Sequence, residues 1–360
     1  MLLTVLTAPS ANAYDLSAFD ESVSELRESM DDQALREMEN MGISGPEDVG
    51  QPDILDAAAY FAGQLSAAAS GPLAALALSI GALLLFSAAQ GYTASLRHTD
   101  MKEISSMVTT LFLTGTVVSP LHDVLQRSVD VIGQVSSVML LYLPLAIGIL
   151  LFSGQVISAG GYYTTMMTAA QLIASLSAGL LSGLLQVFLA VSVCAGIGNR
   201  VRIKGFCDMI NSLLKWILTF LMGIYTAVLS LQTALAGTAD TLANRAARLT
   251  LSSLIPLVGS AVSEAYKTLQ SSVNLLRSGI GIFVIIGTAV TILPVLLQTV
   301  LWQLTLHACK WTAYALSVDS GAALFDALSK VTSILIAILI SVLTVYLIST
   351  AAMLSIGGAA

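Results

Sequence analysis

The sequence predicts an all-α, polytopic helical membrane protein with about seven spans, at least one of them broken or re-entrant. Three observations predict this class: 56% of the 360 residues are hydrophobic, only 10% are charged, and the mean hydropathy is +0.85. Soluble domains carry about 25% charged residues. Because 15 basic and 22 acidic side chains cannot cover the surface of a soluble protein of this length, a soluble enzyme is excluded.

The net charge of -7 is unevenly distributed. Residues 14–56 hold 13 acidic and two basic side chains, so this segment carries -11 and the rest of the chain +4. The membrane part is only mildly basic, which gives no indication of nucleic-acid binding. Cys194, Cys207 and Cys309 have no metal-site spacing, and neither a disulfide framework nor a metal or other cofactor is expected.

The N-terminus has the features of a secretory signal. Residues 1–13 are interpreted as the remnant of a signal peptide, because an apolar stretch precedes Ala11-Asn12-Ala13, although a positively charged leader is missing. A disordered N-terminus is the alternative. With a signal, the acidic segment 14–56 is extracytoplasmic. Helical spacing of apolar residues predicts a helix near 22–41, solvated by default and partner-binding as the alternative.

Apolar runs define a polytopic membrane domain over 57–356. About 20 apolar residues cross a hydrocarbon core of about 30 Å. By this criterion seven spans are predicted, at 72–96, 104–121, 136–158, 172–197, 215–235, 280–306 and 331–356. Asp123, Arg127 and Asp130 fall between the second and third spans, and Lys310, Asp319, Asp326 and Lys330 are expected in a solvated link before the last.

The basic loops set the orientation. Lys and Arg favour the cytoplasmic side, so the loop with Arg97 and Lys102 and the loop 200–204 are both expected there, with the N-terminus extracytoplasmic. Three predicted spans lie between these loops, whereas an even number is required. We therefore expect a discontinuous segment between residues 136 and 198, where Pro and Gly supply break points. An extra crossing at residues 162–178 is the alternative.

Two segments are candidates for contacts with partners. Residues 237–279 are too polar to span and predict an amphipathic hairpin lying in the interface. It is either a surface connector or a partner-docking or conduit-lining element, with candidate residues Arg245, Arg248, Pro256, Gly259 and Glu264. Gly179 and Gly183 form a GxxxG pattern that permits close helix packing, within the chain or in a homo-oligomer.

The same region carries a family resemblance. Leu231-Gln232-Thr233, Arg245-Ala246-Ala247-Arg248, residues 254–265 and Gly279-Ile280-Gly281 followed by Leu293-Pro294 resemble, in this order, the stage III sporulation protein AE family. The acidic segment and the first predicted hairpin fit it too, while Ser260 departs from an expected glycine.

The resemblance implies a role in endospore formation. Members are multi-pass proteins of the mother-cell-derived membrane around the forespore. They act with sibling stage III sporulation membrane proteins, a cytoplasmic ATPase of the same set and a forespore membrane partner, in a channel-like or secretion-like complex needed for late forespore development. The family supplies no catalytic residue.

Two classes of function remain. The first is a non-enzymatic component of such a complex, in contact with membrane lipid, and the second is a self-contained secondary transporter or permease. No enzyme is expected, because His98, His122 and His307 are dispersed and no phosphate-binding loop occurs. A transporter would show an internal repeat, broken helices and a charge near the bilayer midplane.

Overall fold

A computed structural model describes residues 16–46, 54–95, 99–175, 203–254 and 259–355, with single positions 183, 186 and 190 between them. Within these residues every regular element is an α-helix, which confirms the all-α class. The helices are α1 Leu16–Glu28, α2 Asp32–Asn40, α3 Ile54–Ser95, α4 Thr99–Phe152, α5 Val156–Ser175, α7 Ile203–Leu254, α8 Gly259–Ala315 and α9 Asp319–Ser355.

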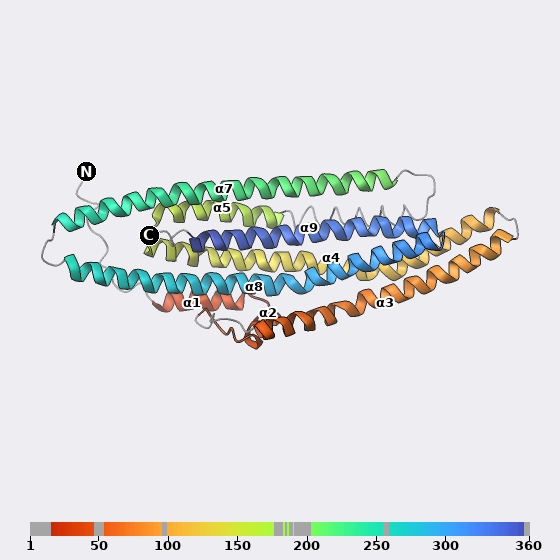
Figure 1. Cartoon of the computed structure of the whole chain (residues 1–360), viewed down its shortest axis with the longest axis horizontal. Helices are drawn as coiled ribbons and strands as arrows, with labels where there is room; N and C mark the ends of the chain where they lie inside the picture. Colours follow the sequence, from red (N-terminus) through yellow and green to blue (C-terminus); the bar gives the residue numbers. More distant parts are fainter. Residues whose placement is uncertain are drawn as a thin grey trace.

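The long helices form one elongated bundle and lie roughly parallel to its axis (Figure 1). α8 has 57 residues and α4 has 54. At about 1.5 Å per residue each is roughly 80 Å long, far more than the ~30 Å of a hydrocarbon core. The helices therefore extend well beyond any bilayer that they cross.

Five helices in the described residues are long and apolar enough to span a membrane: Ala58–Tyr92, Met107–Phe152, Asp208–Asp240, Ser278–Ala315 and Asp319–Ser355. The membrane-spanning character is as predicted, but the count of seven is not confirmed. The predicted spans 104–121 and 136–158 overlap one continuous helix, α4, and most of the predicted span 172–197 lies outside the described residues.

The continuity of α4 removes the orientation conflict. The stretch with Asp123, Arg127 and Asp130 is not a loop, because Leu121, Val124, Leu125 and Ser128 recur at helical spacing and are all buried against the bundle. The chain leaves Lys102 in the first turn of α4, crosses once and turns back through α5. α7, with Lys204 in its first turn, begins at the same end as α4 (Figure 1). The predicted span 104–121 and most of the predicted span 136–158 therefore belong to one helix.

The chain reverses between α4 and α5 in a tight turn inside the stretch 136–198, where the sequence predicted a discontinuous segment, but the turn lies at the end of an apolar helix and not within it. Gly154 has φ +75°, a backbone conformation that side chains other than glycine rarely adopt. Its amide N–H donates to the Leu151 carbonyl at 3.0 Å, and the Gln155 N–H donates to the Leu150 carbonyl at 2.9 Å. These bonds close the last turn of α4 and let α5 fold back on it.

The acidic N-terminal segment forms two helices instead of the single exposed helix expected. Their apolar sides pack on the bundle, α1 on α4 and α2 on α8, with Leu26, Met30, Ala34 and Met38 buried. Gly287 of α8 makes the close approach possible, because a Cβ there would lie 3.1 Å from the Met30 sulfur. The charged side chains mostly remain outside, so this segment covers the bundle.

The region 237–279 continues the spans instead of forming separate helices. α7 runs unbroken to Leu254 and α8 starts at Gly259, so the break lies where the sequence placed the kink. Figure 1 shows that the ends of α7 and α8 extend beyond the ends of α5 and α9. The two helices thus form a hairpin that projects from the bundle, and the name α7–α8 hairpin is used for residues 241–254 and 259–277.

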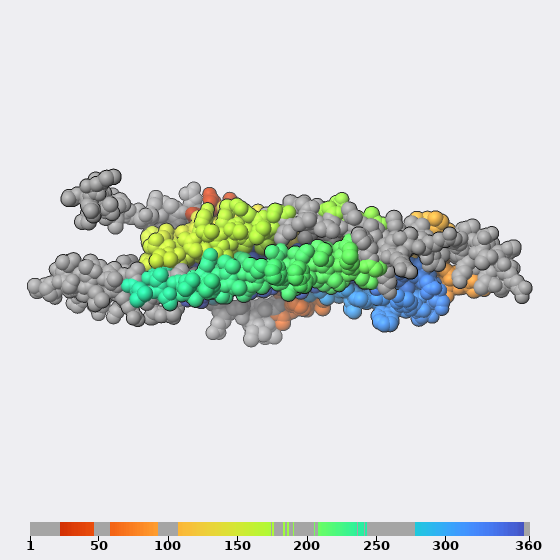
Figure 2. All heavy atoms as spheres, turned by 90° about the horizontal axis from the view of Figure 1, so that it is seen from above, coloured from red at the N-terminus to blue at the C-terminus, as the bar shows by residue number. Residues whose placement is uncertain are grey.

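The core of the bundle is built on α8 and α9. Trp302, Phe325 and Tyr346 are almost completely buried there. α7, by contrast, lies along the outside of the bundle, as the space-filling view from above shows (Figure 2). It exposes a long row of apolar side chains, including Leu213, Trp216, Phe220, Ile224 and Leu231, a surface typical of contact with lipid tails.

Candidate functional site

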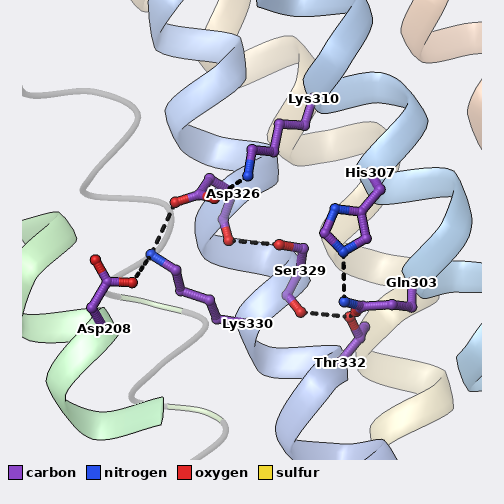
Figure 3. A network of polar contacts seen from close by, with 8 residues as sticks. All are labelled: Asp208, Gln303, His307, Lys310, Asp326, Ser329, Lys330 and Thr332. Atoms are coloured by element: carbon purple, nitrogen blue, oxygen red, sulfur yellow. Dashed lines mark hydrogen bonds and ion pairs between the residues drawn. The ribbon is translucent and has the colours of Figure 1, made fainter. Parts of the chain in front are cut away.

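Four charged side chains from three helices meet inside the bundle (Figure 3). The Asp326 carboxylate of α9 accepts an ion pair from Lys310 of α8 at 2.6 Å and from Lys330, one turn further along α9, at 2.9 Å. Lys330 also pairs with Asp208 of α7 at 2.6 Å. We call Asp208, Lys310, Asp326 and Lys330 the charge network. Its formal charges cancel, and it joins α7, α8 and α9.

The charge network is poorly accessible to solvent at its centre. The side chains of Asp326 and Lys330 are 10% and 12% exposed and that of Lys310 is 21% exposed, whereas Asp208 is 52% exposed. Removing one partner of a buried ion pair typically costs about 3–5 kcal/mol, because the other charge stays behind without compensation. The inner three residues therefore depend on one another, and Asp208 closes the network toward solvent.

Hydrogen bonds extend the charge network along α9 and across to α8. The Ser329 hydroxyl donates to the Asp326 carbonyl at 2.8 Å, and the Thr332 hydroxyl contacts both the Ser329 carbonyl at 3.0 Å and the Gln303 side-chain oxygen. The Gln303 amide nitrogen lies 2.9 Å from His307 Nε2. Polar contacts therefore continue from Lys310 to His307 within otherwise apolar helices (Figure 3).

This arrangement can fix the positions of α7, α8 and α9 relative to one another, and its charged groups are paired with one another. Each carboxylate of the charge network faces an ammonium group. Among the described residues no group of three or more His, Cys, Asp or Glu side chains could hold a metal ion. Ionisable residues inside membrane helices are costly and usually functional, so the charge network is the strongest candidate site in the described structure.

The charge network is not predicted by the sequence, which places Lys310, Asp319, Asp326 and Lys330 in a solvated link. In the structure this link is only residues 316–318, and Asp326 and Lys330 lie in α9. The available signal was the spacing of Asp326 and Lys330, which are four residues apart on one helix face. Pairing with α7 and α8 could not be found without the tertiary structure.

A second polar group lies where α5 meets α7. Asp240 is almost fully buried, and its two carboxylate oxygens accept the N–H groups of Ile157 at 3.0 Å and Ser158 at 2.8 Å. These N–H groups belong to the first turn of α5, where a negative charge is favourable. Further along the same contact, Thr165 hydrogen-bonds to Gln232. Asp240 therefore fixes the start of α5 against α7.

The predicted site residues are not brought into the charge network. Arg245 lies on the α7 arm of the α7–α8 hairpin and Glu264 on the α8 arm, while Gly259 is the first residue of α8. Arg248 also belongs to α7. Apart from that of Leu242, the side chains of this hairpin lie outside the described residues, as does all of Pro256.

The GxxxG pattern is only partly described, because Gly179 lies outside the described residues. Gly183 is exposed, and no atom lies within 4 Å of the position that a Cβ would occupy there. Close packing of Gly183 within the chain is therefore not observed.

Comparison with known proteins bears on the family. The family model described as stage III sporulation protein AE matches residues 55–357, which run from the second residue of α3 to beyond the end of α9. The chain belongs to the stage III sporulation protein AE family. Membership in this family, together with five apolar helices, makes it a membrane protein with a role in sporulation.

A characterised relative agrees with this assignment. The chain is 19% identical over 196 residues to stage III sporulation protein AE of Bacillus subtilis (strain 168). The matched region covers 54% of this chain and 48% of the relative, so the chain spans about half the length of the protein it matches. No solved structure matches the chain.

Proposed function

We propose that this protein is a non-enzymatic integral component of a channel or secretion-like complex in the mother-cell-derived membrane around the forespore, and that late forespore development requires it. The observation that carries the proposal is the α7–α8 hairpin. Beyond the apolar spans that end at Asp240 and begin at Ser278, α7 continues for 14 residues and α8 for 19. Each helix therefore extends roughly 20–28 Å beyond its apolar span.

The orientation of the hairpin supports contact with a second membrane. α4 and α7, which carry Lys102 and Lys204 in their first turns, begin at the opposite end of the bundle (Figure 1), and basic ends favour the cytoplasm. The hairpin is then extracytoplasmic, and a signal peptide at 1–13 would place the acidic segment 14–56 on the same side of the membrane. In a membrane around the forespore, this side faces the forespore membrane.

The hairpin end and the basic end of the bundle each suggest a partner. A forespore membrane protein or a sibling stage III sporulation membrane protein would bind the hairpin, where Arg245 and Arg248 lie on one arm and Glu264 on the other. The cytoplasmic ATPase would act at the basic end, because the chain supplies no nucleotide-binding loop of its own.

Affinity purification from sporulating cells tests the complex. A tagged chain solubilised in mild detergent should retain sibling membrane proteins and the ATPase. A matched purification of the Arg245→Glu/Arg248→Glu variant should retain less of the hairpin-bound partner. Recovery of the wild-type chain alone, at normal membrane level, would contradict the proposal.

Charge reversal on the hairpin tests its role in the cell. Arg245→Glu/Arg248→Glu should block forespore development while the membrane level of the protein stays unchanged. Arg27→Glu/Arg36→Glu is the matched control, since it changes the total charge equally on exposed positions of α1 and α2. Normal spore yield in the hairpin variant, or an equal defect in the control, would refute a specific role of the hairpin.

A self-contained secondary transporter is the second candidate, and the charge network is the observation that favours it. Transporters carry ionisable groups inside the bundle near broken helices. A lone transporter would retain substrate uptake when purified and reconstituted without siblings, and that uptake would depend on Asp326. A complex component would show neither property.

A further inference from the structure

The outward face of α4 carries a row of polar residues. Between Ser119 and Ser137 the exposed side chains on this face recur at helical spacing, and they are Ser119, Asp123, Gln126, Arg127, Asp130, Gln134 and Ser137. We call these seven residues the α4 stripe. It covers 18 residue steps, or about 27 Å of helix, which is close to the ~30 Å thickness of a hydrocarbon core.

Contacts with α9 place the α4 stripe at an apolar level of the bundle. Leu113 of α4 lies beside Gly321 of α9, and the Tyr346 hydroxyl of α9 donates to the Ser136 hydroxyl of α4 at 3.0 Å. The stripe therefore runs beside the part of α9 that follows the charge network. Residues 331–355 of α9 contain no charged side chain.

Lipid tails cannot be the surroundings of the α4 stripe. A charged residue at the centre of a membrane helix costs about 2.5–3.5 kcal/mol on insertion scales, and the stripe has three. Arg127 lies in its middle, roughly 12 Å or more of helix from either end, too far for its side chain to reach the interface. The exposed face of α7 carries the apolar side chains Ile217, Leu221 and Ile224 instead.

We propose that the α4 stripe lines a water-filled passage through the membrane. This inference rests on the channel function proposed above and assigns the chain a share of the passage wall. A helix contact in lipid needs only one or two polar groups among small residues, whereas the stripe is polar over the whole thickness and carries both signs of charge. One stripe cannot enclose a passage, so other subunits of the complex supply the remaining wall.

Cysteine accessibility tests the passage. Single cysteines replace Asp123, Gln126, Asp130 or Gln134 in a full-length chain whose native cysteines are changed to alanine. Membranes from sporulating cells are treated with a charged, membrane-impermeant methanethiosulfonate, and the remaining thiols are counted with a maleimide after denaturation. The reaction needs a thiolate, which water stabilises and lipid does not. We expect labelling at least ten-fold faster than at the matched controls.

The controls are Leu221→Cys and Ile224→Cys on α7. Both positions are exposed and lie between Lys215 and Tyr225, which hydrogen-bond to Ser333 and Ser349 of α9, so they occupy a comparable depth. Each variant is first checked for normal membrane level and for the tryptophan fluorescence spectrum of the parent chain. Using four stripe positions keeps the test informative if one variant does not fold.

Stripe cysteines that label as slowly as the α7 controls would overturn the proposal. So would stripe cysteines that are protected in native membranes but react once the chain is purified alone, because a polar helix of a partner then covers the stripe. Failure of the proposed complex gives a different result, since no siblings would co-purify even if the stripe cysteines react.

Discussion

Neutralising Asp326 should destabilise the bundle more than any other single change in the charge network. In Asp326→Asn, Lys310 loses the partner that lies 2.6 Å away, while Lys330 keeps Asp208 at 2.6 Å. One ammonium group, 21% exposed, is then left without a counterion. From the cost of breaking a buried pair we expect a loss of about 3 kcal/mol in the free energy of unfolding.

Two variants separate this explanation from a general effect of mutation. Asp208→Asn should cost at most about 1 kcal/mol, because Asp208 is half exposed and Lys330 retains Asp326. Asp326→Asn/Lys310→Met removes both charges of one pair and should recover part of the loss, since no uncompensated charge remains.

Denaturation in detergent measures the order of these variants. With the exposed Trp216 and Trp311 changed to phenylalanine, the buried Trp302 in α8 reports unfolding through its fluorescence. The reasoning is refuted if Asp208→Asn costs as much as Asp326→Asn, or if the double variant is no more stable than the single one.

Three further predictions concern two other contacts and the orientation in the membrane. Asp240→Ala removes both acceptors at the start of α5 and should cost about 1–2 kcal/mol, with faster hydrogen exchange at the Ile157 and Ser158 amides as the direct measurement. Gly279→Ala places a Cβ against the Pro46 carbonyl oxygen, so the segment after α2 should separate from α8 and become sensitive to protease. Gly133→Ala is the control, because a Cβ there meets no other atom, and it should leave the protease sensitivity unchanged. A reporter at Ser22 should be extracytoplasmic and one at Lys204 cytoplasmic; equal labelling of both from outside would reject the orientation.

The sequence predicted the spans in α3, α8 and α9, because 72–96, 280–306 and 331–356 are long enough to cross a bilayer and contain no charged side chain. It could not predict where these helices end. Hydropathy reports which residues tolerate lipid, and helices such as α7 and α8 continue into water without a change in backbone structure.

The error in α4 has a physical cause. Asp123, Arg127 and Asp130 were interpreted as a loop because charge was equated with the end of a span. The buried positions Leu121, Val124, Leu125 and Ser128 already had the period of a helix with one polar side. The candidate site could not be predicted for a different reason. Asp208 and Lys330 pair across α7 and α9, which are separated in the sequence by the whole of α8, so no local pattern relates them.

The docking of the N-terminal region on α8 has a consequence for biosynthesis. Tyr60 of α3 donates to the carbonyl of Val290, 230 residues later in the chain, and Met30 and Met38 lie near Gly287. At about 5–20 residues per second, a ribosome needs roughly 10–50 s to make the intervening chain. During that interval α1 can already pack on α4, whereas Met30 and the buried side of α2 lack the α8 surface that later covers them. The acidic residues on the exposed side of α2 keep this part of the nascent segment in contact with water until α8 arrives.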